Sequence, residues 1–232
     1  MKAHCVVEYL KLVELFNYEF TRGQVNSEWL LLPSIARISN PESCFNMGFC
    51  TWDEVEEFLL DEFKSQSLPY VSIKPEGDLS WMILAQHYSL ATRLLDWTTN
   101  PLKSLFFAVE NMDSNDGVVY FCSSIYFTSE KFVPNLSEID EVTFFKSSHS
   151  NDRLVAQEGG FCAFPLPKGV LFEKFDPLIL ENSKNITLNK IIIDAVSKHS
   201  IRNELNRLGI NHRTIYPSMD GVSKSIMNGF KS

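Results

Sequence analysis

The sequence predicts a single α+β domain. Its 232 residues suffice for one large domain with a hydrophobic core, and the 44% of hydrophobic and 12% of aromatic residues are typical of a globular protein. Segments with helical spacing of apolar residues occur together with short runs of β-branched and aromatic residues. We therefore expect one domain over residues 1–232, with an N-terminal helix at about 4–17 and a core over about 18–230.

Two helices and a strand are expected in the first third of the chain. Residues 4–17 place valines and leucines near helical spacing, and a strand around residues 18–22 follows. A second helix is expected over residues 51–66, where Thr51 can cap the N-terminus and Glu54 completes a capping box. The acidic residues in its first turns suit the positive end of the helix dipole and indicate a solvated face.

The middle of the chain concentrates charge in an apolar setting. A helix over residues 80–90 leads into a strand-like segment in which Arg93 and Asp96 stand beside leucines and a tryptophan. Because an isolated buried ion costs on the order of several kcal/mol, these two side chains should pair with each other or with groups from elsewhere in the chain. An Asn-Pro pair then precedes a buried helix over residues 102–110. A strand, a polar corner and a helix in this order present side chains into a cleft.

Further strands and helices are expected in the second half. Residues 124–150 show no firm periodicity and form either a long excursion or a pair of short helices. Gly159 and Gly160 precede an aromatic strand, which indicates a bulge or a close approach of a ligand to the backbone. The remaining expected elements are strands at 118–124 and 189–195, a helix at 198–210 stopped by Gly209, and a strand and terminal helix over 213–227.

Composition limits the classes of partner and compartment. The net charge of −8 and the pI near 5.2 argue against generic binding along a nucleic-acid backbone, although a local basic groove stays open. The five cysteines are scattered and odd in number, so neither a disulfide framework nor a zinc site is indicated. No signal peptide or bilayer-spanning run is recognisable. We expect a cytoplasmic protein without a membrane partner and without a metal.

Three motifs and a closing segment carry a resemblance to a known family. Residues 86–108, QHYSLATRLLDWTTNPLKSLFFA, resemble the second motif of the bacterial FRG domain family at a dozen positions. Residues 20–37 resemble its first motif, with Thr21 in place of the aromatic residue before the arginine. Residues 151–167 and the segment beginning at Tyr216 are similar to its third and closing motifs. The resemblance extends over nearly the whole chain and is weakest at 38–80 and 124–150.

The FRG motifs are in turn similar in order to those of ADP-ribosyltransferases, which implies a split β-sheet core with flanking helices and NAD as the substrate. In that layout a strand-borne arginine is followed by a Ser-Thr-Ser strand, whose place Asp96, Trp97 and Thr98 would take. Ser104 and Phe107 then fall six and nine residues after Thr98, on the helix behind the nicotinamide pocket.

The resemblance implies roles for individual residues. Arg22 would hold the pyrophosphate or ribose, Trp97 could stack near the nicotinamide, and Thr98 would support the pocket. Glu158 or Gln157 would be the catalytic residue near the ribose, where an oxocarbenium-like state develops positive charge. The predicted catalytic residues are Arg22, Gln157 and Glu158, and the predicted NAD-binding residues are Arg22, Gly23, Gln24, His87, Thr92, Arg93, Asp96, Trp97, Thr98 and Phe107.

Structural alternatives stay open at several of these positions. Arg22 could instead pair with a core carboxylate such as Asp96, Glu158 could be a turn residue, and His87 could be a hydrogen-bonded structural histidine. Arg37 is as well explained by a surface or loop-bracing role.

The function expected first is mono-ADP-ribosyl transfer from NAD. The resemblance implies an intracellular toxin or anti-phage effector acting on RNA, DNA or protein, and a toxin implies a neutralising antitoxin protein. The alternative is a nucleotide-sensing or partner-binding module in which Arg22 and Arg93 clamp an anionic ligand without chemistry. A metal-independent nuclease or hydrolase is the third hypothesis, and no paired carboxylates or Ser/His/Asp arrangement in the sequence supports it.

Overall fold

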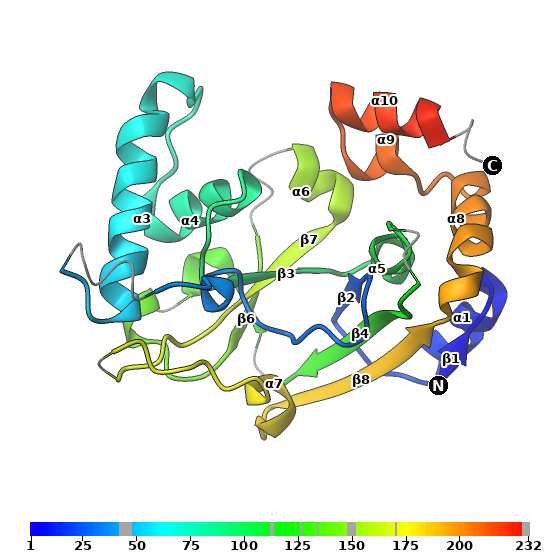
Figure 1. Cartoon of the computed structure of the whole chain (residues 1–232), viewed down its shortest axis with the longest axis horizontal. Helices are drawn as coiled ribbons and strands as arrows, with labels where there is room; N and C mark the ends of the chain where they lie inside the picture. The colour runs from blue at the N-terminus through cyan, green and yellow to red at the C-terminus, as the bar shows by residue number, and fades with distance from the viewer. Residues whose placement is uncertain are drawn as a thin grey trace.

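The computed structural model describes residues 1–41, 48–111, 114–125, 127–133, 135–147, 152–169 and 171–228. One mixed sheet of eight strands runs through it in the order β1-β8-β4-β2-β3-β7-β6-β5 (Figure 1). The pairs β1–β8 and β5–β6 are parallel and the other neighbours are antiparallel. The strands are β1 Lys2–Ala3, β2 Phe20–Gln24, β3 Leu94–Thr98, β4 Gly117–Ser124, β5 Phe127–Ser129, β6 Thr143–Lys146, β7 Gly159–Ala163 and β8 Ile186–Ile193.

Helices cover the sheet, and the mixture confirms the predicted α+β class. They are α1 Val6–Val13, α3 Trp52–Ser67, α4 Gly77–His87, α5 Pro101–Ala108, α6 Asp152–Gln157, α7 Ile179–Asn182, α8 Lys198–Arg207, α9 His212–Ile215 and α10 Met219–Asn228. Short 3₁₀ turns lie at Ile35–Arg37, Leu68–Tyr70, Glu130–Phe132, Leu136–Glu138 and Ala195–Ser197. No helix in the described ranges is both long and apolar enough to cross a membrane.

Strand β4 is the centre of the hydrophobic core. Because side chains alternate across a strand, Val119 and Phe121 pack with helices α1, α5 and α8, whereas Val118, Tyr120 and Cys122 pack with Trp97, Phe144 and Leu180 on the opposite face. At the other end of the sheet, α3 and α4 cover β3, β7 and β6 through a third cluster (Figure 1). Apolar side chains therefore fix the helices on either side of the strands that bear the polar motif residues.

Most predicted elements agree with the structure. The capping box at Thr51 and Glu54 begins α3, and the residues predicted as a strand at 118–124 are in β4. Gly209 follows α8 with a φ of +83°, which an L side chain rarely adopts.

Three details differ from expectation. The strand predicted at the start of 213–227 is wrong, because Asn211 caps a short helix there, α9, by accepting from the Arg213 and Thr214 amides. Gly159 and Gly160 are explained by packing, since a Cβ at Gly160 would lie 2.7 Å from a ring carbon of Phe20. Residues 127–146 contain two short strands as well as the two predicted short helical turns.

Candidate functional site

The sheet opens between β2 and β3. Within the described residues these two strands pair at one position, Thr21 with Thr98, whereas β2 pairs with β4 along all five of its residues. Beyond that pair the side chain of Arg22 spans the gap, and its Nη1 donates to the main-chain oxygen of Asp96 at 2.5 Å. The guanidinium group therefore lies between the two strands. One alternative for Arg22 was a salt bridge to Asp96, and the structure shows a hydrogen bond to the Asp96 main chain instead.

Helix α5 packs directly on the other face of β2. The hydroxyls of Thr21 and Ser104 lie 2.5 Å apart, and both side chains are fully buried. A Cβ built on Gly23 would lie 1.9 Å from the main-chain oxygen of Ser104, so the glycine is required for this close approach. Asn100 caps α5 by accepting from the amides of Leu102 and Lys103.

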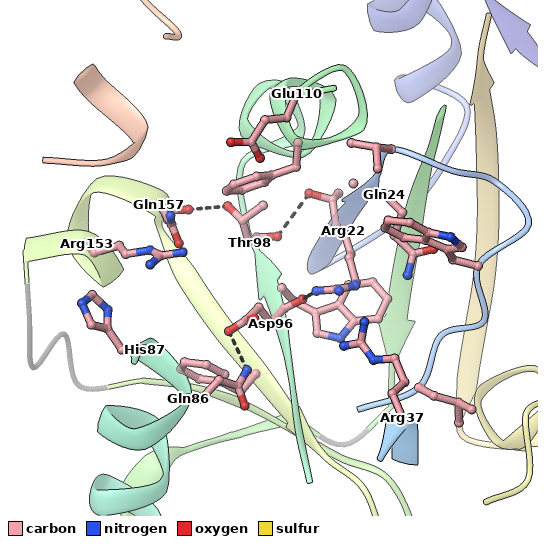
Figure 2. A pocket seen from close by; sticks show the side chains of 18 of the residues that line it. Arg22, Gln24, Arg37, Gln86, His87, Asp96, Thr98, Glu110, Arg153 and Gln157 are labelled. Atoms are coloured by element: carbon pink, nitrogen blue, oxygen red, sulfur yellow. Dashed lines mark hydrogen bonds between the residues drawn. The ribbon is translucent and has the colours of Figure 1, made fainter. Parts of the chain in front are cut away.

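A cavity of about 960 Å³ extends along this opening. Its walls come from β2 and the residues after it, the end of α4, β3, α5, α6 and the segment after α9 (Figure 2). The lining residues include Arg22, Gly23, Gln24, His87, Asp96, Trp97, Thr98, Phe107 and Gln157 of the predicted site. The volume lies within the range of sites that hold small molecules and cofactors.

Positive charge is concentrated around Arg22. Burial lowers the pKa of Arg22, Asp96 opposes that shift, and the neighbouring Arg37 adds to it. An arginine nevertheless stays protonated in proteins. Its Nε is buried and has no hydrogen-bond partner among the described residues. The Arg22 guanidinium therefore lies in the cavity wall with one donor that no described protein atom satisfies.

Two successive hydrogen bonds hold the Asp96 side chain at the cavity. Gln86 donates from Nε2 to Asp96 Oδ1 at 2.8 Å, and the Thr92 hydroxyl donates to Gln86 Oε1. Thr92 therefore lies behind Gln86 and does not line the cavity. Sequence reasoning noted Gln86 in the motif but did not assign it to the site.

Thr98 connects the cavity to helix α6. Its hydroxyl donates to the main-chain oxygen of Gln157 at 2.6 Å (Figure 2). Gln157 Nε2 donates to the main-chain oxygen of Ile215 at 3.3 Å. Gln157 is also one of the residues that line the cavity.

Glu158 has its carboxylate outside the cavity lining, beside Lys103 and Asn100. Its φ of +48° is left-handed, and its carboxylate contacts Lys103 Nζ at 2.8 Å and Asn100 Nδ2 at 3.1 Å. The hydrogen bond from Lys103 lowers the pKa of Glu158 below its ordinary value, and a further bond from Asn100 adds to this. Glu158 is absent from the cavity lining and braces the start of α5.

Arg93 also lies away from the cavity. It is 4% exposed, and its Nε donates to Glu56 Oε2 at 2.6 Å while its Nη1 donates to the oxygen of Leu136 at 2.7 Å. The prediction that buried charges find partners is thus confirmed for Arg93, and the partner Glu56 comes from α3.

The two predicted aromatic residues differ in exposure. The Trp97 indole is buried, donates from Nε1 to Cys162 Sγ at 3.1 Å and meets the Phe144 ring edge-on, so it contributes to the cavity floor from within the core. Phe107 is partly buried on α5 and forms part of the wall. His87 is half-buried, and both burial and the charge of Arg153 lower its pKa.

The comparisons with known proteins identify one domain. A protein-family model, FRG domain, matches residues 17–117. Over these residues the chain is similar to the FRG domain. No curated protein and no solved structure matches the chain.

The cavity is lined by residues inside and outside the segment that matches the FRG domain. Arg153, Gln157 and Tyr216 line it from outside residues 17–117, and Glu110 lines it from within. Tyr216 donates from its hydroxyl to the Glu110 carboxylate at 3.0 Å. Sequence reasoning placed Arg153 and Tyr216 in motifs but assigned no site role to them or to Glu110, and only the fold brings these segments together.

Proposed function

We propose that this protein binds NAD in the cavity and transfers ADP-ribose from it to a macromolecular acceptor. The observation that carries the proposal is the opening of the sheet beside Thr21 and Thr98, with the Arg22 guanidinium at its centre. A charged donor in a cavity of about 960 Å³ that has both polar and apolar walls suits a ligand that combines phosphates with flat rings. The split-sheet core of an ADP-ribosyltransferase, implied by the resemblance, is part of this proposal, whereas the described strands form one sheet in which β2 and β3 are neighbours.

Each wall of the cavity would have a separate task. Arg22, with Arg37 nearby, would hold the pyrophosphate through charge-assisted hydrogen bonds. Phe107 and the edge of Trp97 would contact the nicotinamide. The Gln157 amide would accept a hydrogen bond from a ribose hydroxyl and thereby orient C1′ toward the acceptor.

The proposed step is substitution at C1′ of the nicotinamide-bearing ribose. The C1′–N bond breaks, nicotinamide leaves as a neutral molecule with the bonding electron pair, and the acceptor forms a bond to C1′ and loses its proton to water. An amide cannot take that proton, so Gln157 would act by orientation. Glu158 stays a catalytic candidate in this proposal, and its carboxylate would have to leave Lys103 to reach the ribose.

Transfer of label from NAD tests the proposal. Purified protein is incubated with NAD labelled in the adenylate part and, separately, with total RNA, DNA and protein. We expect label in one pool, a loss of about 100-fold or more for Arg22→Ala because a preorganised donor is removed, and little change for the exposed Arg207→Ala control. Equal transfer by Arg22→Ala at an unchanged melting temperature would contradict the assignment.

A second candidate function is nucleotide binding without chemistry. It is favoured by the position of Glu158, whose carboxylate is paired with Lys103 outside the cavity, and by the neutral Gln157 that lines the cavity instead. Binding of NAD without release of nicotinamide in any pool, and an unchanged affinity for Glu158→Gln, would select this function. Release that depends on Glu158 would select the transferase.

The cellular role implied by the resemblance is also a proposal. A toxin or anti-phage effector should arrest growth when its expression is induced in a bacterial host, and Arg22→Ala should relieve the arrest at equal protein level. Co-expression of neighbouring genes would then reveal an antitoxin. Normal growth under full expression of the wild type, without such a gene, would contradict the toxin proposal.

A further inference from the structure

Gln24 carries a buried polar atom that the described part of the protein leaves without a partner. The residue is 7% exposed, and its Oε1 has no hydrogen-bond partner. Leaving a buried acceptor unpaired costs free energy, and such groups in folded proteins usually have a protein, water or ligand partner. Because Gln24 lines the cavity, a ligand that donates a hydrogen bond there would satisfy it.

Gln24 and Arg22 belong to the same face of β2. They are two residues apart on the strand and pair with Val118 and Tyr120 of β4, so their Cα atoms are separated by roughly 7 Å. Figure 2 shows both on the side of the cavity away from His87 and Arg153. A ligand group that lies about one ring's length along β2 from a phosphate on Arg22 is therefore beside Gln24.

A flat apolar side chain completes this end of the cavity. Trp29 follows β2, lines the cavity and is 51% exposed. An indole of this kind offers a stacking surface to any base, whereas the Gln24 amide offers one acceptor and one donor at a base edge. The combination of anion site, stacking surface and amide is that of a nucleotide-base pocket.

We propose that Gln24 determines specificity for adenine by hydrogen bonding to its 6-amino group and N7. Oε1 accepts from the amino group and Nε2 donates to N7, the pairing that glutamine makes with the major-groove edge of adenine. A 6-oxo purine presents two acceptors at the same edge, and rotation of the amide cannot satisfy both. The inference rests on the proposed binding of NAD and assigns its adenosine half to the Gln24 end, leaving the nicotinamide half to the Phe107 end.

Calorimetric titration with three dinucleotides tests the assignment. The ligands are NAD, its hypoxanthine analogue, which changes only the 6-amino group, and nicotinic acid adenine dinucleotide, which changes only the carboxamide. The wild type should bind NAD about 10- to 100-fold more tightly than the hypoxanthine analogue. Gln24→Met, which keeps side-chain length but removes the amide, should bind the two about equally.

The matched control is Gln66→Met, an exposed glutamine on α3 that bonds to Glu62, and it should keep the wild-type ratio. If the wild type binds NAD and its hypoxanthine analogue equally, the adenine assignment is wrong even if no variant folds. If it discriminates only against the nicotinic acid dinucleotide and Gln24→Met removes that discrimination, Gln24 contacts the carboxamide instead. Failure of the wild type to bind NAD at all would overturn the proposed function itself.

Discussion

Gly23 fixes the distance between β2 and α5. A methyl group at this position would lie 1.9 Å from the Ser104 oxygen and 2.8 Å from the Ala108 nitrogen, and both atoms belong to the helix backbone. Gly23→Ala must therefore push α5 away from the sheet, which we expect to lower the free energy of unfolding by about 3 kcal/mol. Urea unfolding followed by circular dichroism measures the change.

Gly169→Ala provides the matched control for this prediction. The atom nearest to its added methyl is Glu173 Oε2 at 2.5 Å, the end of a flexible side chain that can rotate away, and none of the three nearest atoms belongs to the main chain. We expect a change within about 0.5 kcal/mol, as at ordinary surface sites. Equal stability losses in the two variants would show that the close approach at Gly23 is not the cause.

Arg93 and Glu56 form a buried ion pair remote from the cavity. Their side chains are 4% and 8% exposed, and Arg93 Nη2 lies 2.5 Å from Glu56 Oε2. Removing one partner leaves the other charge buried, so Arg93→Met should destabilise the protein by about 3–5 kcal/mol. The double variant Arg93→Met with Glu56→Leu should be more stable than Arg93→Met in urea unfolding, and a double variant that is less stable would contradict this account.

At the scale of secondary-structure elements, Glu110, which follows α5, contacts His212 of α9 and Tyr216 directly after α9. Burial raises the pKa of Glu110, but interactions with His212 and Tyr216 outweigh burial and bring the pKa below its ordinary value. A carboxylate with a lowered folded-state pKa stabilises the fold above its unfolded pKa of about 4.3, and this stabilisation is lost as pH falls through the folded-state pKa.

Tyr216→Phe tests this link between elements. The variant loses the hydroxyl that donates to Glu110, so we expect it to be less stable at pH 7 by about 1.5–3 kcal/mol, as for a hydrogen bond to a charged group. The difference should shrink as pH falls through the folded-state pKa of Glu110, because the carboxylate then becomes protonated. Urea unfolding from pH 7 to pH 3 measures it, with the exposed Tyr70→Phe as control, and a pH-independent difference would exclude Glu110 as the partner.

For the whole molecule, sequence patterns predicted local structure better than they predicted which groups the individual charged side chains contact. The Thr51 cap and the apolar runs of β4 and β8 follow from neighbouring residues, because capping and strand burial are local properties. Arg93 and Glu158 stand in motifs beside cavity residues, yet Arg93 is buried against Glu56, and Glu158, in a left-handed conformation, contacts Lys103. Glu110 and Tyr216 meet across 106 positions of sequence, a contact that no local pattern encodes.

Ligand binding should stabilise the whole fold, because the cavity walls come from β2, β3, α5, α6 and the segment after α9. A ligand that binds only the folded state at 100 times its Kd adds about 2.7 kcal/mol to stability. For a chain of this length each kcal/mol raises Tm by roughly 2–4 °C, so saturating NAD should raise Tm by about 5–10 °C.

Differential scanning calorimetry of wild type, Arg22→Ala and Arg207→Ala with and without NAD checks this expectation. Arg22→Ala should lose most of the increase, since its guanidinium spans the opening between β2 and β3, whereas Arg207→Ala should keep it. An equal increase in all three variants would place the ligand outside this opening.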